Sequence, residues 1–192
     1  MDGWDSDWDI TSTAGFEEAL AWVEQVDWMH AAPPCRTFSR RRRADGFGQV
    51  KQLRSKERPE GFGDPDAEQA NLIAKRLAAL CGKLQSRGRF WSIENPADSF
   101  LWELKEFVKL AKLEGVMWVY LDQCAYGAPS PKPTYVLTNA PWLVDTGRLC
   151  RDAPPHSHAV LEGRALDYRV DPPVRVWRTA LGAEYPVALC SA

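Results

Sequence analysis

Apolar and polar residues alternate along this chain with two spacings, one typical of helices and one typical of buried strands. Residues 15–26 place apolar side chains at helical spacing and lead directly into the apolar run 28–32, which predicts a strand. Residues 66–86 predict a longer helix, because one face of it collects Leu72, Ile73, Leu77, Leu80 and Leu84.

The same alternation continues toward the C-terminus. We expect a strand, a helix and two further strands, over residues 90–93, 97–113, 116–121 and 134–138. From residue 140 the chain is proline-rich and irregular, with a short final helix near residues 185–190. The alternation predicts an α/β fold with a mostly parallel sheet and helices on both faces. We therefore expect a domain over residues 1–139 and an irregular C-terminal extension over residues 140–192.

Composition places the protein inside the cell, in the nucleus or the cytoplasm. Its 192 residues are 45% hydrophobic and 26% charged, which is ordinary for a globular protein. No apolar run approaches the roughly 20 residues that span a bilayer, so we expect no membrane association. The first thirty residues are acidic, which excludes a secretory signal. Five cysteines, an odd number without a C-x-x-C pair, favour a reducing compartment.

Charge is distributed unevenly along the chain although the net charge is only −2. Residues 1–30 carry eight acidic side chains and no lysine or arginine. Residues 36–58 carry nine basic side chains against two acidic ones. This basic segment predicts a polyanionic partner, with DNA expected and RNA as an alternative. A solvated basic loop without a partner is the other interpretation of the same pattern.

Reactive and polar side chains follow the predicted strands. Cys35 comes directly after the stiff pair Pro33-Pro34, and Glu94-Asn95 follows the next strand. The carboxyl ends of parallel strands meet at one edge, so Cys35 and Glu94 converge despite their separation in sequence. Alone, a cysteine after such a turn is more often a buried structural thiol. Together with a carboxylic acid, a thiolate suits attack on an electron-poor ring whose nitrogen the acid holds.

Four segments, in order, resemble the motifs of cytosine-5 DNA methyltransferases. Pro33-Pro34-Cys35-Arg36-Thr37-Phe38-Ser39 resembles the segment with the nucleophilic cysteine of that family, and Glu94-Asn95-Pro96 resembles its Glu-Asn-Val motif. Tyr126-Gly127-Ala128-Pro129 with Lys132 is similar to its Tyr-Gly-Val-Pro-Gln-x-Arg segment. Asp9-Ile10 resembles the pair that contacts the adenosyl group of the methyl donor.

The resemblance implies a Rossmann-like methyltransferase three-layer sandwich that uses S-adenosylmethionine on a flipped cytosine. It implies that Cys35 adds to ring carbon 6, that Glu94 contacts nitrogen 3, and that Lys132 is the third catalytic residue. It also implies cofactor contacts from Asp9, Ile10 and Pro33. The implied nucleic-acid contacts are Arg36, Ser39, Arg40, Arg41, Arg42 and Arg43.

The sequence differs from the motifs of that family at several positions, and these differences lead to further predictions. Lys132 and Thr134 stand where the family has two arginines, and Ser130 replaces a glutamine. The glycine-rich first strand and cofactor loop do not precede Asp9, so we expect an N-terminally truncated domain. The strand at 28–32 then becomes an exposed apolar edge that another chain would cover. A catalytically inactive nucleic-acid-binding module and a degenerate fragment are the alternatives to an active methyltransferase.

One further group of residues has side chains that suit a metal. Cys150, His156 and His158, with Cys124, have ligand types that bind zinc. Their spacing matches no standard zinc pattern. The sequence therefore predicts no metal site and treats these residues as unligated parts of a loop, with zinc as the alternative.

Overall fold

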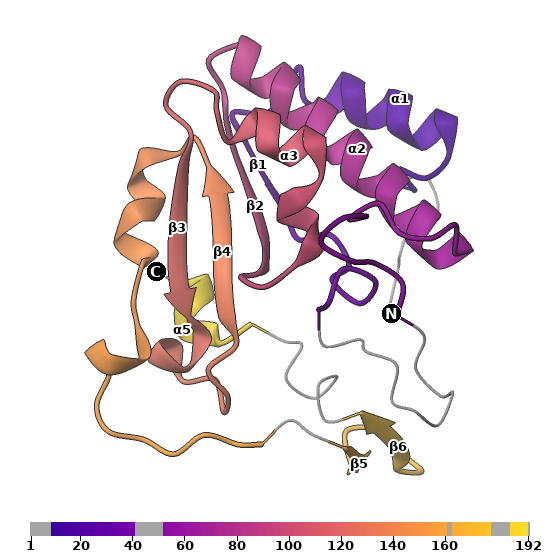
Figure 1. Ribbon diagram of the computed structural model, residues 1–192. Coiled ribbons are helices and arrows are strands. Elements are labelled where there is room, and N and C mark those ends of the chain that lie inside the picture. The colour runs from indigo at the N-terminus through magenta and orange to yellow at the C-terminus, as the bar shows by residue number, and fades with distance from the viewer. Residues whose placement is uncertain (1–8, 41–51, 161–162, 178–184, 192) are drawn as a thin grey trace. The chain divides into compact units, whose positions relative to one another are not determined.

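The computed structural model describes residues 9–40, 52–160, 163–177 and 185–191 (Figure 1). The chain forms two compact units. Unit 1 comprises Met1–Trp118 with Tyr135–Trp142, and unit 2 comprises Val119–Thr134 with Leu143–Ala192. No helix in the described ranges is long and apolar enough to cross a membrane.

A four-stranded sheet with the order β1-β2-β4-β3 is built from β1 (Trp28–Ala31), β2 (Phe90–Pro96), β4 (Pro133–Thr138) and β3 (Met117–Asp122). β1 and β2 are parallel. The arrows of β3 and β4 point in opposite directions (Figure 1). The fold is therefore α/β, as predicted, but its sheet is mixed rather than mostly parallel.

The contacts between β2 and β4 explain the mixed sheet. The Trp91 backbone N–H donates to Asn139 Oδ1 at 2.7 Å, and Thr138 Oγ1 donates to the Trp91 carbonyl at 2.6 Å. These bonds hold the end of β4 beside the beginning of β2, which is the arrangement of antiparallel neighbours.

The two longer helices begin at side-chain caps that the sequence provides. Helix α1 (Thr13–Trp22) begins after Ser12, whose hydroxyl accepts the Gly15 N–H at 2.9 Å. Helix α2 (Pro65–Ser86) begins after Asp64, with a proline in its first turn. The expected helix over residues 97–113 is divided into η2 (Phe100–Glu103) and α3 (Lys105–Leu110). Leu104 separates them with extended backbone at ψ 137°, and its side chain is buried.

The core of unit 1 lies between these helices and one face of the strands. Ala31 from β1 and Trp91 and Ile93 from β2 pack with buried residues of α1, α2 and α3. These residues alternate along their strands, so they share one face. Figure 1 shows α1, α2 and α3 gathered on one side of β1 and β2. The predicted helices on both faces are not seen among the described residues of this unit, because all three α-helices join one core.

The opposite face of β1 and β2 carries polar groups. His30 and Ser92 are paired in register, and His30 Nδ1 lies 2.8 Å from Ser92 Oγ. His30 keeps much of its surface exposed, but the partial desolvation of its ring lowers its pKa below the usual value, because fewer water molecules solvate the charged imidazolium. This face of the sheet therefore places a histidine beside β2, the strand that contains Glu94.

Unit 2 contains more regular structure than the sequence predicted. A hairpin of β5 (Arg164–Asp167) and β6 (Val174–Trp177) lies where irregular chain was expected. The short helices η3 (Gln123–Tyr126), η5 (Cys150–Asp152) and α5 (Val187–Cys190) belong to the same unit. A further short helix, η4 (Pro141–Thr146), crosses the boundary between the units in sequence. The sequence did not predict this hairpin because each of its strands has only four residues. So few residues give no clear alternation of apolar and polar side chains.

Candidate functional site

Cys35 follows β1, and Glu94 lies near the end of the adjacent parallel strand β2, both in unit 1. Ala31 pairs with Ile93, so the chain beyond both residues emerges at the same edge of the sheet. Cys35 lies four positions beyond Ala31, is exposed and forms no disulfide in the described part of the chain. Glu94 comes directly after Ile93 and is only 8% exposed. An accessible thiol and a buried carboxyl group thus share one edge.

A buried amide connects the two strand ends. Asn95 Nδ2 donates to the Pro33 carbonyl at 2.8 Å, and Asn95 is 1% exposed. This bond joins the neighbour of Glu94 to the turn that precedes Cys35. Because a buried hydrogen bond is costly to break, it restrains the turn relative to β2.

Arg54 holds the other side of the Cys35 loop, and it is 1% exposed. Its guanidinium donates to the Thr37 carbonyl at 2.9 Å and to Thr37 Oγ1 at 3.2 Å. Its other three donors reach the Pro59 carbonyl, Asn71 Oδ1 and the Ala67 carbonyl at 2.6, 2.7 and 3.0 Å. All five N–H groups of an arginine are thereby used. The guanidinium also stacks 3.8 Å from the centre of the Phe38 ring.

The environment of Arg54 corrects the interpretation of the basic segment. Burial lowers the pKa of Arg54 to about 10, which still leaves it charged at neutral pH. Because its donors are all used inside the protein, it is not available to a phosphate. Nothing in the sequence distinguishes it from the exposed basic residues around it, so its role as a support of the loop was missed.

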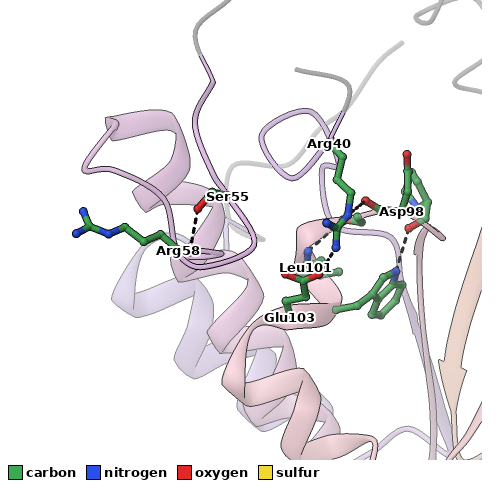
Figure 2. A network of polar contacts seen from close by, with 9 residues as sticks. Arg40, Ser55, Arg58, Asp98, Leu101 and Glu103 are labelled. Atoms are coloured by element: carbon green, nitrogen blue, oxygen red, sulfur yellow. Dashed lines mark hydrogen bonds and ion pairs between the residues drawn. The ribbon is translucent and has the colours of Figure 1, made fainter. Parts of the chain in front are cut away.

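Two implied nucleic-acid contacts have structural roles in the loop after β1. Ser39 forms an isolated antiparallel bridge with Ser99. Arg40 Nε donates to the Asp98 carbonyl at 2.9 Å and pairs with Glu103, and its guanidinium lies 4.4 Å from the Phe100 ring centre. Figure 2 shows Arg40 directed toward Asp98 and Glu103. These contacts hold the loop against the segment that follows β2.

The remaining basic residues of the segment are exposed or lie outside the described residues. Arg36 forms an ion pair of 2.7 Å with Asp66, and both side chains are mostly exposed. Such a pair contributes little stability, so Arg36 is able to exchange Asp66 for a phosphate. Arg58 is exposed, with its backbone N–H donated to Ser55 Oγ at 3.1 Å (Figure 2). Arg41, Arg42 and Arg43 lie outside the described residues.

The residues implied as cofactor contacts are used within the fold. The Asp9 carboxylate accepts the Thr11 N–H and hydroxyl, each at 2.8 Å, and these bonds lower the pKa of Asp9. Ile10 packs against the core, and its carbonyl accepts a hydrogen bond from Arg76. The Pro33 carbonyl accepts the Asn95 amide. Asp9 and Ile10 thus stabilise the turn that precedes α1, and Pro33 holds the turn before Cys35.

Lys132, the third implied catalytic residue, belongs to unit 2 rather than to the unit that carries Cys35 and Glu94. It precedes β4 with a positive φ of 37°, and its ammonium lies 5.4 Å from the centre of the Tyr185 ring. Nearby, Gln123 Nε2 donates to Thr134 Oγ1 at 3.2 Å in the interior of unit 2.

No protein-family model matches the chain, and no curated protein or solved structure is significantly similar to it. The site is therefore interpreted from its own geometry and from the resemblance of its motifs.

Proposed function

We propose that unit 1 carries the nucleophile and acid of a cytosine-5 DNA methyltransferase-like site. The observation that carries the proposal is the pairing of β1 with β2, which gives an exposed Cys35 and a buried Glu94 a common edge. The fold we propose for unit 1 is a Rossmann-like methyltransferase domain. The substrate is a cytosine flipped out of DNA.

The proposed reaction begins with addition of the Cys35 thiolate to carbon 6 of the cytosine ring. The new carbon–sulfur bond breaks the double bond between carbons 5 and 6, and the electron pair is delocalised through the ring toward nitrogen 3. Glu94 donates a proton to nitrogen 3 and so stabilises this pair. Carbon 5 then becomes nucleophilic. Carbon 5 takes up a proton from solvent, and its original hydrogen then leaves to solvent as a proton. The electron pair of that carbon–hydrogen bond re-forms the double bond between carbons 5 and 6 and expels the Cys35 thiolate. The proton on nitrogen 3 returns to Glu94, so the net result is exchange of the hydrogen at carbon 5 with solvent.

The loop that carries Cys35 is held from two sides, as a nucleophile requires. Asn95 restrains the turn before Cys35, and Arg54 restrains Thr37 beyond it. A reacting group must be held within a fraction of an ångström of its productive position to retain its rate. Both residues are positioning residues, because each acts through the Cys35 loop.

The proposal ends before methyl transfer. S-adenosylmethionine remains the donor that the resemblance implies, but the polar groups of Asp9 and Pro33 are already hydrogen-bonded within the protein. Gly15, six residues after Asp9, makes room for the Asp9 carbonyl rather than for a ligand, since a Cβ there would lie 2.3 Å from that oxygen. The described residues therefore do not fit a cofactor cradle, and we derive no step through the donor.

A cofactor-independent trap tests the proposal. DNA in which 2-pyrimidinone replaces cytosine should form a covalent adduct with the full chain, seen as a shifted band on a denaturing gel. Cys35→Ser should abolish the band, and Cys190→Ser, which alters another exposed cysteine, should retain it. Absence of an adduct with the unaltered chain, or an adduct that survives Cys35→Ser, would overturn the proposal.

A nucleic-acid-binding module without chemistry is the second candidate, favoured by the internal use of the three implied cofactor contacts. It predicts DNA binding that weakens steeply with rising salt, because phosphate contacts release counterions. It also predicts no adduct and no exchange of the hydrogen at cytosine carbon 5 with solvent. Binding and exchange measured on the same preparation therefore separate the two candidates.

A further inference from the structure

Two cysteines and two histidines converge in unit 2, and none of them belongs to the proposed nucleophile site. Cys124 comes from η3, Cys150 begins η5, and His156 and His158 lie on the segment that follows. One ligand atom from each residue, sulfur or ring nitrogen, lies within 4.8 Å of all the others. Cys124 is buried and Cys150 is half-buried, so the cluster extends from the interior to the surface.

The distances between these sulfur and nitrogen atoms are compatible with a single metal ion bound among them. Cys150 Sγ lies 3.5 Å from His158 Nε2 and 3.9 Å from His156 Nε2, and the two Nε2 atoms are 3.0 Å apart. Tetrahedral zinc, with bonds of about 2.3 Å to sulfur and about 2.0 Å to nitrogen, places its ligand atoms roughly 3.3–3.8 Å from one another. The three distances among Cys150, His156 and His158 lie in or close to that range, and Cys124 Sγ lies within 4.8 Å of the other three atoms.

The ring of His156 is oriented as a ligand. Its Nδ1 lies 2.7 Å from the Pro154 carbonyl, which accepts hydrogen bonds and donates none. Nδ1 therefore carries the proton, and a neutral ring has its lone pair on Nε2, the atom that faces the cluster. Histidine ligands of metals usually have such a carbonyl on their second nitrogen.

Hydrogen bonds donated by backbone N–H groups hold in place the segments that carry these four residues. The Cys150 N–H donates to Asp122 Oδ2 at 2.9 Å, which joins the start of η5 to the residue that precedes η3. The Ala159 N–H donates to the Pro129 carbonyl at 2.6 Å, which returns the segment beyond His158 to the loop after η3. Both connections bring together residues that are distant in sequence, and neither depends on the four candidate ligands' side chains.

We propose that Cys124 Sγ, Cys150 Sγ, His156 Nε2 and His158 Nε2 bind one zinc ion. Two thiolates and two imidazoles match the preference of zinc for sulfur and nitrogen, and the thiolates neutralise its charge. Four protein ligands leave no position for water or substrate, so the site is structural. It fixes the segment 150–158 onto η3 within unit 2. This inference uses none of the residues of the proposed nucleophile site and stands independently of that function.

Metal content and cobalt substitution test the assignment on the full chain. The purified protein should contain about one zinc per chain, and exchange for Co²⁺ should give the intense visible bands of tetrahedral cobalt with sulfur ligands. Cys124→Ser, Cys150→Ser and His158→Ala should each weaken these bands and lower zinc content several-fold. Cys190→Ser and His30→Gln are matched controls and should change neither, because both residues lie outside the cluster.

Thiol labelling of the unaltered chain avoids any dependence on the folding of variants. Cys124 and Cys150 should resist alkylation until a chelator removes the metal, and peptide mass spectrometry should then find both labelled. Chain without zinc that gives no cobalt bands would overturn the proposal. Full zinc content in the Cys124→Ser and Cys150→Ser variants, or a Cys124–Cys150 disulfide in the reduced preparation, would equally overturn it.

Discussion

Arg54 donates two hydrogen bonds to Thr37, one to its carbonyl at 2.9 Å and one to its hydroxyl at 3.2 Å. Thr37 lies two residues beyond Cys35, so an arginine from the basic segment supports the loop that carries the candidate nucleophile. The rest of its guanidinium is fully engaged in the interior. A side chain that the sequence assigned to a charged surface is therefore part of the framework of the site.

Arg54→Lys should destabilise unit 1 and disturb the Cys35 loop. Lysine keeps the charge but provides three donors in place of five, so buried acceptors lose their partners at a cost of about 2–4 kcal/mol. Urea denaturation measures this cost, and adduct formation with the trap DNA should slow in the same variant. Arg58→Lys, in the same segment but exposed, should leave both unchanged. Equal stability of the two variants would refute the structural role of Arg54.

Alanine at Gly15 and at Gly82 should have opposite effects on stability. A Cβ at Gly15 would lie 2.3 Å from the Asp9 carbonyl oxygen, so Gly15→Ala should cost about 1–3 kcal/mol through the strain of overpacking. Gly82 lies inside α2 with nothing within 4 Å of the added atom. Gly82→Ala should therefore stabilise by about 0.5–1 kcal/mol, because alanine favours helices. The free energy of unfolding of each variant checks the pair, and the same sign at both positions would contradict this packing.

Acidification should destabilise unit 1 through His30. Partial desolvation lowers the pKa of His30 below the ordinary value of 6.5 although much of the residue is exposed, so the unfolded chain binds a proton at a pH where the folded chain binds less. The free energy of unfolding should therefore fall as pH decreases below about 6.5, and this stability is fully present above that value. In the His30→Gln variant, the free energy of unfolding should change less between pH 7 and pH 5 than it does in the unaltered chain. An imidazole pKa above 6.5 by NMR would contradict the prediction.

The edge strand β1 should promote self-association. It is an outer strand of the four-stranded sheet, and Trp28 on it is 45% exposed. Exposed apolar edges pair with other chains, and a charged residue on the edge prevents this. Trp28→Lys should therefore reduce concentration-dependent association in sedimentation velocity. Trp142→Lys, which alters another tryptophan with 47% exposure outside the strands, is the matched control. Equal association of both variants and the unaltered chain would refute a role for the edge.

Several elements of the fold followed from local patterns. The helix α2 has its cap, its proline and its apolar face encoded within its own residues, so its ends were predicted to within one residue. The apolar run before Pro33 predicted β1 for the same reason. The division of the expected helix at 97–113 was not predictable, because Leu104 leaves helical geometry and its side chain is buried among residues from elsewhere in the chain.

Some features of the candidate sites could likewise be predicted from the sequence, and others could not. Cys35 and Glu94 were placed at one edge by a general rule for parallel strands, which needs only the order of elements. The convergence of Cys124, Cys150, His156 and His158 was only an alternative in the sequence, because their spacing matches no zinc pattern. These residues come together through the Asp122–Cys150 and Pro129–Ala159 hydrogen bonds, which no spacing rule contains.

The sequence by itself determined the order of the strands and the two longer helices in the larger unit, because caps, prolines and apolar periodicity act over a few positions. The break at Leu104 and the extension of β2 to Pro96 appeared only in the structure. The tertiary structure alone decided that Arg54 is a support and Arg36 an exposed cation, since burial depends on neighbours from distant segments. It also decided that Cys124, Cys150, His156 and His158 meet. Side chains of one type acquire different roles through the groups that surround them, and those groups are brought together only by folding.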